Sequence, residues 1–444
     1  MKATIIGGGS YAWSIGFMRQ FIESKALEGL SVTLMDIDPE ALATVHKAIA
    51  RYQEARGSHV SVQATGDLDA ALDGADFVLV SISTGGLEAM RADIEIPQQY
   101  GIWHTVGDTV GPGGWCRAAR NIPVFDDLGK RMKARCPDAW MINVSNPLTI
   151  LTRVPRRNWG VKSLGMCPGV EGHVKSLVKL AGLDPAGRLD YTVTGIDHGS
   201  WLTCVLADGV DVLERLKQRG YWRSDDQLPG KMKSDDPMPG AFGSRAVFAL
   251  WRELGYMPGI NDRHIIENLP WFLTDPEGKL EFGIARTPIE ERYEWRRVQK
   301  ERVDKLIATG ELGKLGHGDD PIVTVIESLL GRRSFLYGSN FENVGQIPQL
   351  PAGAVVETRC RFDAAGVSPL CSTMPRILQT LVLPHVLRQE AIIDIALTGS
   401  FDELVALVMT DPLCSRLRMG QVRRMTAAML QANRKYIKNP RLLE

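Results

Sequence analysis

The first forty residues constrain the fold most strongly. A short apolar run over 2–6 leads into the spacing Gly7-x-Gly9-x-x-Ala12 and then into an apolar-periodic segment over 15–27. This is the dinucleotide-binding fingerprint, in which glycines let the backbone approach a pyrophosphate and a helix N-terminus supplies N–H donors. A second strand over 31–35 ends in Asp36, whose carboxylate can accept hydrogen bonds from ribose hydroxyls and would repel a 2′-phosphate. The expected NAD-binding residues here are Gly7, Gly9, Ser10, Tyr11 and Asp36.

Further apolar runs extend this pattern. Strands are expected at 60–64, 75–82, 140–144 and 164–166, and their continuous apolar character is typical of a parallel sheet buried on both faces. We therefore predict an α/β fold in which an N-terminal Rossmann domain, a doubly wound parallel sheet, spans residues 1–195. An interwoven α+β domain for catalysis and oligomerisation would span 196–444, as in lactate and malate dehydrogenases.

Polar residues follow two of these strands. Ser83 comes after the 75–82 run, and Asn143 and Asn146 lie at the end of the 140–144 run. Ligands bind at the carboxyl ends of strands in such sheets, so we expect Ser83 and Asn143 to contact the cofactor. The Asn146 amide can both donate to and accept from vicinal sugar hydroxyls. Asn-Pro is also a common turn initiator, and that alternative stays open.

A glycine-rich segment lies between the expected strands at 75–82 and 140–144. Residues 101–114 read as a loop, and a helix is expected from Trp115 to Leu128 with Arg117 on it. Asp108 and the surrounding glycines suggest a loop that folds over a bound nicotinamide or sugar. An ordinary surface loop would have the same composition.

Cys167 and His198 are the strongest candidates for metal ligands. Thiolate and neutral imidazole both bind divalent transition metals, and each residue follows an expected strand end. A metal would then lie beside the nicotinamide. Taken alone, the same two residues also fit a buried thiol and a hydrogen-bonded core imidazole.

The bulk composition excludes several classes of partner. Lys+Arg and Asp+Glu both number 52, so the formal net charge of zero gives no reason to expect nucleic acid or an anionic membrane. No run of about twenty apolar residues could span a bilayer. Seven irregularly spaced cysteines do not form a disulfide framework in a chain of this length, which favours a reducing cytoplasm.

A hydroxy-acid dehydrogenase is the first function that such a chain suggests, because GIDHGS resembles the Gly-x-His-Gly around the catalytic His of the lactate/malate type. Those enzymes orient the His with an Asp and hold the substrate with an Arg, both just under thirty residues upstream. The corresponding piece here, from Gly165 to Gly172, contains neither an Arg nor an Asp. A Cys stands there instead.

With these residues in view, nearly the whole chain resembles glycoside hydrolase family 4, the NAD-dependent glycosidases. The resemblance rests on GGGS (7–10), GDTVGPGG (107–114), NP (146–147), GMC (165–167), GIDHGSW (195–201) and QIPQLPAGAVVE (346–357). GIWHTVGDTVGPGGW and GYMPGINDRH look most like the α-galacturonidase and α-glucuronidase branch. This family departs from the usual scheme of two catalytic carboxylates.

The resemblance implies an oxidoreductive hydrolysis. C3 of the sugar is transiently oxidised, C2 is deprotonated, the aglycone leaves by elimination, and water adds at C1 before C3 is reduced again. The implied cofactors are NAD and a divalent metal, Mn²⁺ above all. The implied partner is a small carbohydrate, and a homodimer or homotetramer is expected.

The resemblance also implies roles for individual residues. Cys167 and His198 match the metal ligands, and Asn146 matches a substrate-binding Asn. Asp262 would be the C2 base, with His264 as assistant or acid; a capped helix start with a solvated imidazole is the alternative. Two positions depart from the family: Pro168 replaces a polar residue after the metal Cys, and Asp197 replaces an Asn before the His, where it could be a further ligand.

An acidic sugar is the expected substrate. Arg263 and Arg117 could pair bidentately with an anionic group on sugar C6, and Trp201 could stack on a sugar ring. A uronate carboxylate and the sulfonate of sulfoquinovose fit equally well. The remaining alternatives are a neutral hexoside, a sugar dehydrogenase that accumulates NADH, and a non-catalytic NAD sensor.

Overall fold

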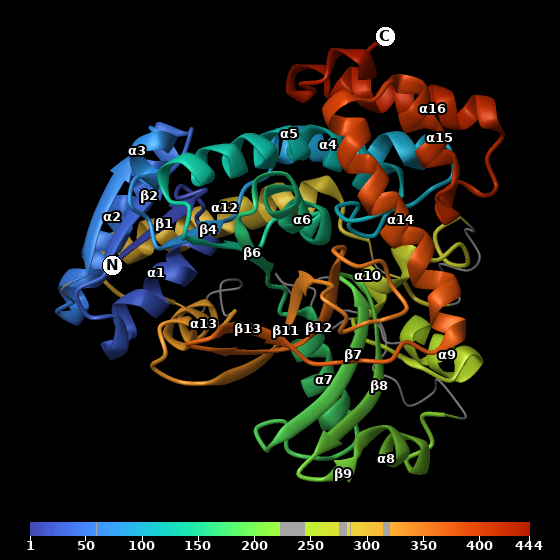
Figure 1. The fold of residues 1–444 in the computed structure, drawn as a ribbon, viewed down its shortest axis with the longest axis horizontal. Helices are drawn as coiled ribbons and strands as arrows, with labels where there is room; N and C mark the ends of the chain where they lie inside the picture. Colours follow the sequence, from blue (N-terminus) through green and yellow to red (C-terminus); the bar gives the residue numbers. More distant parts are fainter. Residues whose placement is uncertain (59, 223–244, 275–281, 285, 314–319) are drawn as a thin grey trace.

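The chain folds around one large sheet. The computed structural model describes residues 1–58, 60–222, 245–274, 282–284, 286–313 and 320–444. Over these residues the sheet has 13 strands, in the order β10-β8-β7-β12-β11-β6-β5-β4-β1-β2-β3, with β13 paired to β12 and β9 to β8. Figure 1 shows the parallel half in blue and green, and the antiparallel half below it in green and orange.

The N-terminal half is the expected doubly wound sheet. Its strands are β1 (Lys2–Ile6), β2 (Ser31–Met35), β3 (Ser61–Thr65), β4 (Phe77–Val80), β5 (Trp140–Asn143) and β6 (Lys162–Gly165). Every pairing among these six strands is parallel, and their order, β3-β2-β1-β4-β5-β6, is that of a dinucleotide-binding fold. The predicted Rossmann fold is confirmed.

The C-terminal half adds antiparallel strands to the same sheet. They are β7 (Leu189–Ile196), β8 (Gly199–Ala207), β9 (Val210–Asp211), β10 (Met257–Pro258), β11 (Phe335–Glu342), β12 (Val355–Asp363) and β13 (Gly366–Pro369). β11 joins β6 through Asn340 and Gly165, and β12 joins β7 through Glu357 and Gly195. β7 pairs only with strands of this half, so a domain boundary after residue 195 would divide that strand; we place it ahead of β7.

Helices cover both faces of the sheet. They are α1 (Trp13–Glu23), α2 (Pro39–Arg56), α3 (Leu68–Leu72), α4 (Gly86–Gln99), α5 (Gly111–Arg135), α6 (Leu148–Trp159), α7 (Gly169–Leu180), α8 (Val212–Gln218), α9 (Arg245–Leu254), α10 (Asp262–Ile265), α12 (Ile289–Thr309), α13 (Ile322–Leu329), α14 (Arg376–Thr398), α15 (Phe401–Met409) and α16 (Met419–Ala432). Short 3₁₀ turns are η1 (Lys25–Leu27), η2 (Ile266–Asn268), η3 (Pro412–Cys414), η4 (Arg434–Tyr436) and η5 (Pro440–Leu442). One apolar core lies under α1, α2, α12 and α13, and the other lies under α5, α6 and α14.

The glycine-rich segment is helical where a loop was expected. α5 begins at Gly111, four residues before Trp115. A Cβ on Gly113 would lie 2.7 Å from the carbonyl oxygen of Asp93 in α4, and one on Gly114 would lie 2.5 Å from the Thr109 backbone. These glycines therefore allow close helix packing, and composition alone does not distinguish that role from a loop.

The segment after α13 also differs from expectation. Strands were expected across 346–370, but residues 346–354 form turns and only β12 and β13 are strands. The eight-residue strand β11 precedes that segment and was not predicted, because buried polar residues such as Ser339 and Asn340 interrupt its apolar pattern.

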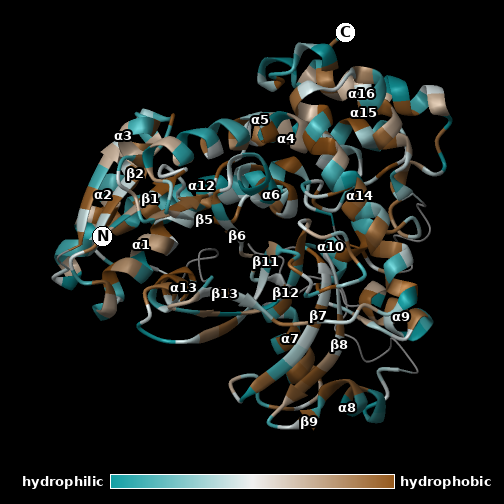
Figure 2. Ribbon diagram, viewed as in Figure 1, coloured by the Kyte–Doolittle hydropathy of each residue, from teal (hydrophilic) through white to brown (hydrophobic). Residues whose placement is uncertain are grey.

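The hydrophobic and hydrophilic residues of the helices are distributed as their packing requires. Figure 2 shows teal and brown residues on the same helices, as in α9 and α14, which is typical of helices that bury one face. Among the described residues, none of the helices combines the length and the apolar character needed to cross a bilayer.

Candidate active site

The two predicted metal ligands meet where the halves of the sheet join. Cys167 follows β6, and His198 lies in the turn between β7 and β8. The Sγ atom of Cys167 lies 3.7 Å from Nε2 of His198, and Oδ2 of Asp197 lies 3.6 Å from the same nitrogen. The ligand atoms of Cys167, Asp197 and His198 all lie within 4.8 Å of one another, and we call them the ligand triad.

The turn that carries His198 has an unusual backbone. His198 has a φ of 61°, a left-handed conformation that few residues other than glycine adopt. Its carbonyl oxygen accepts a 2.8 Å hydrogen bond from the side-chain amide of Asn268. Such conformations persist only where surrounding contacts hold them, and they cluster at functional sites.

The ligand triad has the chemistry of a cation site. Asp197 is fully buried, and neither of its carboxylate oxygens has a well-formed hydrogen bond to the described residues. Burial raises the pKa of Asp197 despite the neighbouring His198, and burial also raises the pKa of the Cys167 thiol. Burial and the neighbouring Asp197 raise the pKa of Glu357 to about 8. A divalent cation would supply the missing positive charge, so these residues fit a metal.

Thr109 fixes which nitrogen of His198 faces the triad. The Thr109 hydroxyl donates to Oδ1 of Asp108 at 2.9 Å, since a carboxylate can only accept. The same hydroxyl lies 2.7 Å from Nδ1 of His198, so it must accept the Nδ1 proton. The Nε2 lone pair is then left to face Cys167 and Asp197. In metal sites, a hydrogen bond from the other ring nitrogen of a His fixes its tautomer and orientation in this way.

Asp108 and His264 lie on the other side of His198. Their ligand atoms and those of His198 lie within 4.8 Å of one another, and the rings of His198 and His264 are 3.9 Å apart. Asp108 also accepts a 3.1 Å bond from the side-chain amide of Asn146. Burial would raise the pKa of Asp108, but His198 and Arg117 lower it well below its usual range. Burial and the nearby His198 lower the pKa of His264, so its imidazole is neutral at pH 7.

Three guanidinium groups surround Asp108, and we call them the arginine cluster: Arg117 from α5, Arg263 from α10 and Arg292 from α12. Burial lowers the pKa of Arg117 and of Arg292 to about 10, and Asp108 opposes the shift in both. Burial also lowers the pKa of Arg263, again against Asp108. Arg117 Nη1 and Arg292 Nε are buried with no hydrogen-bond partner among the described residues. Such donors favour an anionic ligand.

The nucleotide-binding turn has the expected geometry. Gly7 has a φ of 91°, and a Cβ there would lie 2.1 Å from the carbonyl oxygen of Ser81. The Asp36 carboxylate accepts a 2.8 Å hydrogen bond from the backbone N–H of Gly9, at the carboxyl end of β2. Ser10 and Tyr11 complete the turn before α1, and Ser83 follows β4. A cradle that only glycine can form, with an acidic residue beside it, fits a dinucleotide.

Asp262 does not lie among these groups. Its buried carboxylate accepts hydrogen bonds from the backbone N–H groups of Ala246 and Val247, at 3.3 and 2.8 Å, and so caps the first turn of α9. The structure therefore favours a positional role for Asp262 and leaves His264 as the group beside the triad.

Two other residues that were expected to contact a ligand make contacts within the protein. The Asn143 amide donates to Ser145 and Thr152 and accepts from the backbone N–H of Ser145, so it shapes the turn after β5. Trp201 is 1% exposed and packs in the core, which removes it as a stacking surface for a sugar.

Sequence reasoning missed Thr109 and Arg292. It also missed Glu267, a buried carboxylate that accepts hydrogen bonds from the backbone N–H groups of Val106 and Gly107. Thr109 directly follows Asp108, and a hydroxyl residue beside a candidate site residue was the signal that the sequence offered. Arg292 lies in a run of alternating charges that reads as a solvated helix, and α12 is indeed mostly exposed. The pattern does not mark which arginine turns inward.

Comparison with known proteins agrees with this site. The model of the family 4 glycosyl hydrolases matches residues 2–183, and the model of that family's C-terminal domain matches residues 193–414. An α-galacturonidase of Thermoanaerobacterium saccharolyticum is 32% identical, over 97% of this chain and 95% of that protein.

Solved structures share the fold. A candidate glucosidase from Bacillus subtilis superposes with a TM-score of 0.87 at 29% identity, covering 97% of this chain and 99% of that chain. The 6-phospho-β-glucosidase of Thermotoga maritima, solved with manganese, NAD⁺ and glucose-6-phosphate, gives 0.81 at 19% identity, covering 99% and 100%. Malate dehydrogenase of Plasmodium falciparum gives 0.52 at 12% identity, over 91% and 99%, which agrees with the predicted dehydrogenase-like fold.

Proposed function

Because this chain belongs to the family 4 glycosyl hydrolases and is thus a glycoside hydrolase, we propose that it hydrolyses α-glycosides of an acidic sugar, an α-hexuronide. The arginine cluster carries this proposal. Its three positive charges face two buried carboxylates, Asp108 and Glu267, whose pKa values are both lowered. Glu291 also acts on Arg263 and Arg292, so the cluster keeps little excess positive charge, which matches a monoanionic group on the substrate better than a phosphate dianion. The similarity to an α-galacturonidase supports a uronate.

The proposed cofactors are NAD at the Gly7–Gly9 turn and a divalent metal, Mn²⁺ above all, held by Cys167, His198 and Asp197. The geometry of the ligand triad supports the metal, and the Thermotoga maritima structure offers a precedent for both groups in this fold. When bound, NAD supplies reversible oxidation at C3 of the sugar, which acidifies the C2 proton, and the metal supplies Lewis acidity to the sugar oxygens.

We assign the remaining roles to side chains around the triad. His264 is the C2 base through Nδ1, which is buried without a hydrogen-bond partner among the described residues. Asn146 binds a sugar hydroxyl while its amide holds Asp108. Arg117, Arg263 and Arg292 bind the anionic group and so fix the orientation of the sugar. Asp262 holds α10 against α9 and thereby positions Arg263 and His264.

A sulfonated sugar is the second candidate substrate, because a sulfonate is also a monoanion that guanidinium groups bind. The test is a panel of nitrophenyl α-glycosides with galacturonate, glucuronate, sulfoquinovose and neutral hexose rings, each with and without NAD and Mn²⁺. We expect release of nitrophenol from a uronide, no net NADH, and loss of activity with EDTA. Net NADH would indicate a sugar dehydrogenase, and turnover of the neutral glycosides alone would contradict the proposal.

The C2 step has its own test. With a substrate deuterated at C2, turnover in ordinary H₂O should replace the C2 deuterium of the released sugar with hydrogen from the solvent. A His264→Gln variant should bind NAD normally but lose this exchange together with hydrolysis. Retention of the deuterium by the wild-type enzyme would contradict the elimination route.

A further inference from the structure

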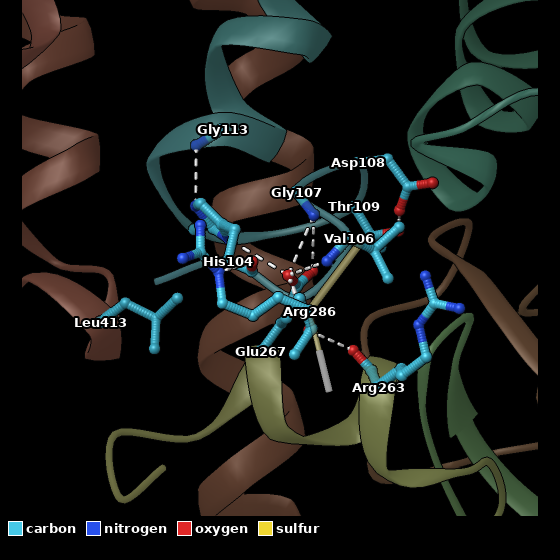
Figure 3. Close-up of polar contacts among 12 residues, drawn as sticks. His104, Val106, Gly107, Asp108, Thr109, Gly113, Arg263, Glu267, Arg286 and Leu413 are labelled. Atoms are coloured by element: carbon cyan, nitrogen blue, oxygen red, sulfur yellow. Dashed lines mark hydrogen bonds and ion pairs between the residues drawn. The ribbon is translucent and has the colours of Figure 1, made fainter. Parts of the chain in front are cut away.

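A buried carboxylate holds the loop next to the ligand triad. Glu267, in η2, is 1% exposed. Its Oε1 atom accepts hydrogen bonds from the backbone N–H groups of Val106 and Gly107, at 2.8 and 2.9 Å, and from the Thr105 hydroxyl at 3.0 Å. Figure 3 shows these bonds converging on one oxygen, with His104 on one side and Asp108 and Thr109 on the other.

His104 extends this contact to the first turn of α5. Its Nδ1 lies 3.2 Å from Oε1 of Glu267, and its Nε2 accepts a 3.2 Å bond from the backbone N–H of Gly113. Because Nε2 accepts, Nδ1 must carry the proton and donate it to Glu267. Three N–H donors from the 104–107 loop therefore meet the Glu267 carboxylate. The Thr105 hydroxyl has one proton, which it shares between Oε1 of Glu267 and the carbonyl oxygen of Arg263.

The next two residues of that loop determine the state of His198. Asp108 and Thr109 follow Gly107 directly, and the Thr109 hydroxyl accepts the Nδ1 proton of His198. The carboxylate that fixes residues 104–107 lies on the segment that also carries Arg263 and His264. Thr105 joins the two segments a second time, since its hydroxyl lies 2.5 Å from the carbonyl oxygen of Arg263.

We propose that Glu267 is a positioning residue that sets the metal affinity of the site: it fixes the 104–107 loop, and through Thr109 it keeps the Nε2 lone pair of His198 directed at Cys167 and Asp197. This inference rests on the metal site of the proposed function. We assign Glu267 no catalytic role, because it is buried and its carboxylate accepts from the N–H donors of the 104–107 loop. Hydrogen bonds from His104 and from backbone N–H groups lower the pKa of Glu267 against its burial, so the carboxylate stays ionised.

The test compares Mn²⁺ binding in the full-length protein and in Glu267→Gln, measured by calorimetry with Mn²⁺ alone and separately with NAD alone. A neutral amide accepts these hydrogen bonds more weakly than a carboxylate does. We expect the affinity for Mn²⁺ to fall about 10- to 100-fold, as for other contacts that orient metal-binding imidazoles. The affinity for NAD should not change, because the Gly7–Gly9 turn lies between β1 and α1 and has no hydrogen bond to Glu267 among the described residues. Wild-type affinity for Mn²⁺ in the variant would overturn the proposal.

A double-mutant cycle tests the route through Thr109. Thr109→Val removes the hydroxyl but keeps the shape of the side chain, and Thr109→Ser keeps the hydroxyl. If Glu267 acts through Thr109, the Glu267→Gln/Thr109→Val double variant should bind Mn²⁺ no more weakly than the weaker single variant, and Thr109→Ser should bind normally. Losses that simply add would overturn the route.

Two controls separate positioning from general destabilisation. Leu216→Ala truncates a buried side chain in α8, far from the site (Figure 1), and should lower the thermal midpoint without weakening Mn²⁺ binding. If Glu267→Gln does not fold, Thr105→Val removes the hydroxyl that lies between Glu267 and Arg263 and should weaken Mn²⁺ binding less; no weakening would overturn the proposal. Since Mn²⁺ binding is measured without substrate, this result is independent of whether the enzyme cleaves a uronide.

Discussion

Single residues explain what the sequence predicts about the site and what it cannot. Cys167 and His198 were identifiable because thiol and imidazole are scarce types and each follows a strand end. Thr109, Glu267 and Arg292 are common types whose roles depend on where their side chains point. Asp262 shows a different ambiguity: an acidic residue in a promising motif also caps a helix.

Arg292 gives the sharpest test of substrate charge. Replacing it with Gln should lower kcat/KM for the uronide about 10- to 100-fold, because a hydrogen bond to a charged group contributes about 1.5–3 kcal/mol. Activity on a neutral glycoside of the same sugar series should change little. Arg296→Gln, an exposed arginine one turn further along α12, is the matched control and should behave as wild type. Equal losses on charged and neutral substrates would place Arg292 outside the anion site.

At the scale of elements, the alternating strands and helices up to β6 followed from apolar runs, since parallel strands buried on both faces leave a strong signal. The start of α5 did not, because glycine favours a loop on average and a helix only where another backbone approaches closely. The strands of the C-terminal half were partly missed because they pair across long sequence separations, for example β6 with β11.

The glycines of α5 and α7 give a matched pair of predictions. Gly113→Ala should destabilise the fold by about 1–3 kcal/mol, because its Cβ would meet Asp93 O at 2.7 Å and His104 Nε2 at 3.2 Å. Gly172→Ala, in the exposed face of α7 with nothing within 4 Å of the new Cβ, should stabilise it by about 0.5–1 kcal/mol. Urea unfolding measures both, and a neutral Gly113→Ala would contradict the tight packing described for this turn.

His173 on α7 predicts how stability depends on pH. Burial lowers the pKa of its imidazole from 6.5 to about 4. Between these values the unfolded chain binds a proton that the folded chain does not, so the free energy of unfolding should fall as the pH drops from about 6.5 to about 4. His173→Leu should lose less stability than wild type between pH 7.5 and pH 5 in urea unfolding.

Other histidines provide the controls for that experiment. His385, whose pKa burial also lowers to about 4, should preserve part of the pH dependence in the His173→Leu variant. His264, whose pKa burial also lowers, should contribute in the same direction. A His173→Leu variant with the full wild-type dependence would show that this imidazole is protonated in the folded protein.

At the scale of the whole molecule, the two halves form one sheet. β6 joins β11, β7 joins β12, and α14 from the C-terminal half packs on α5 and α6 of the N-terminal half. The matched family models divide the chain between residues 183 and 193, yet the ligand triad takes Cys167 from one side of that boundary and His198 from the other. The metal site therefore needs both halves in place. The predicted homo-oligomer and cytoplasmic setting stay predictions.

This architecture predicts one unfolding transition that responds to both cofactors. The proposed NAD site at the Gly7–Gly9 turn lies in the N-terminal half, and the proposed Mn²⁺ site lies between the halves, so each ligand should raise the midpoint of the same transition. At about 100 times its dissociation constant, each should add about 2.7 kcal/mol to the free energy of unfolding, and EDTA should reverse only the Mn²⁺ contribution. Calorimetric scans with neither, either and both ligands measure this. Two separate transitions, with NAD shifting only one of them, would mean that the halves fold independently despite their shared strands.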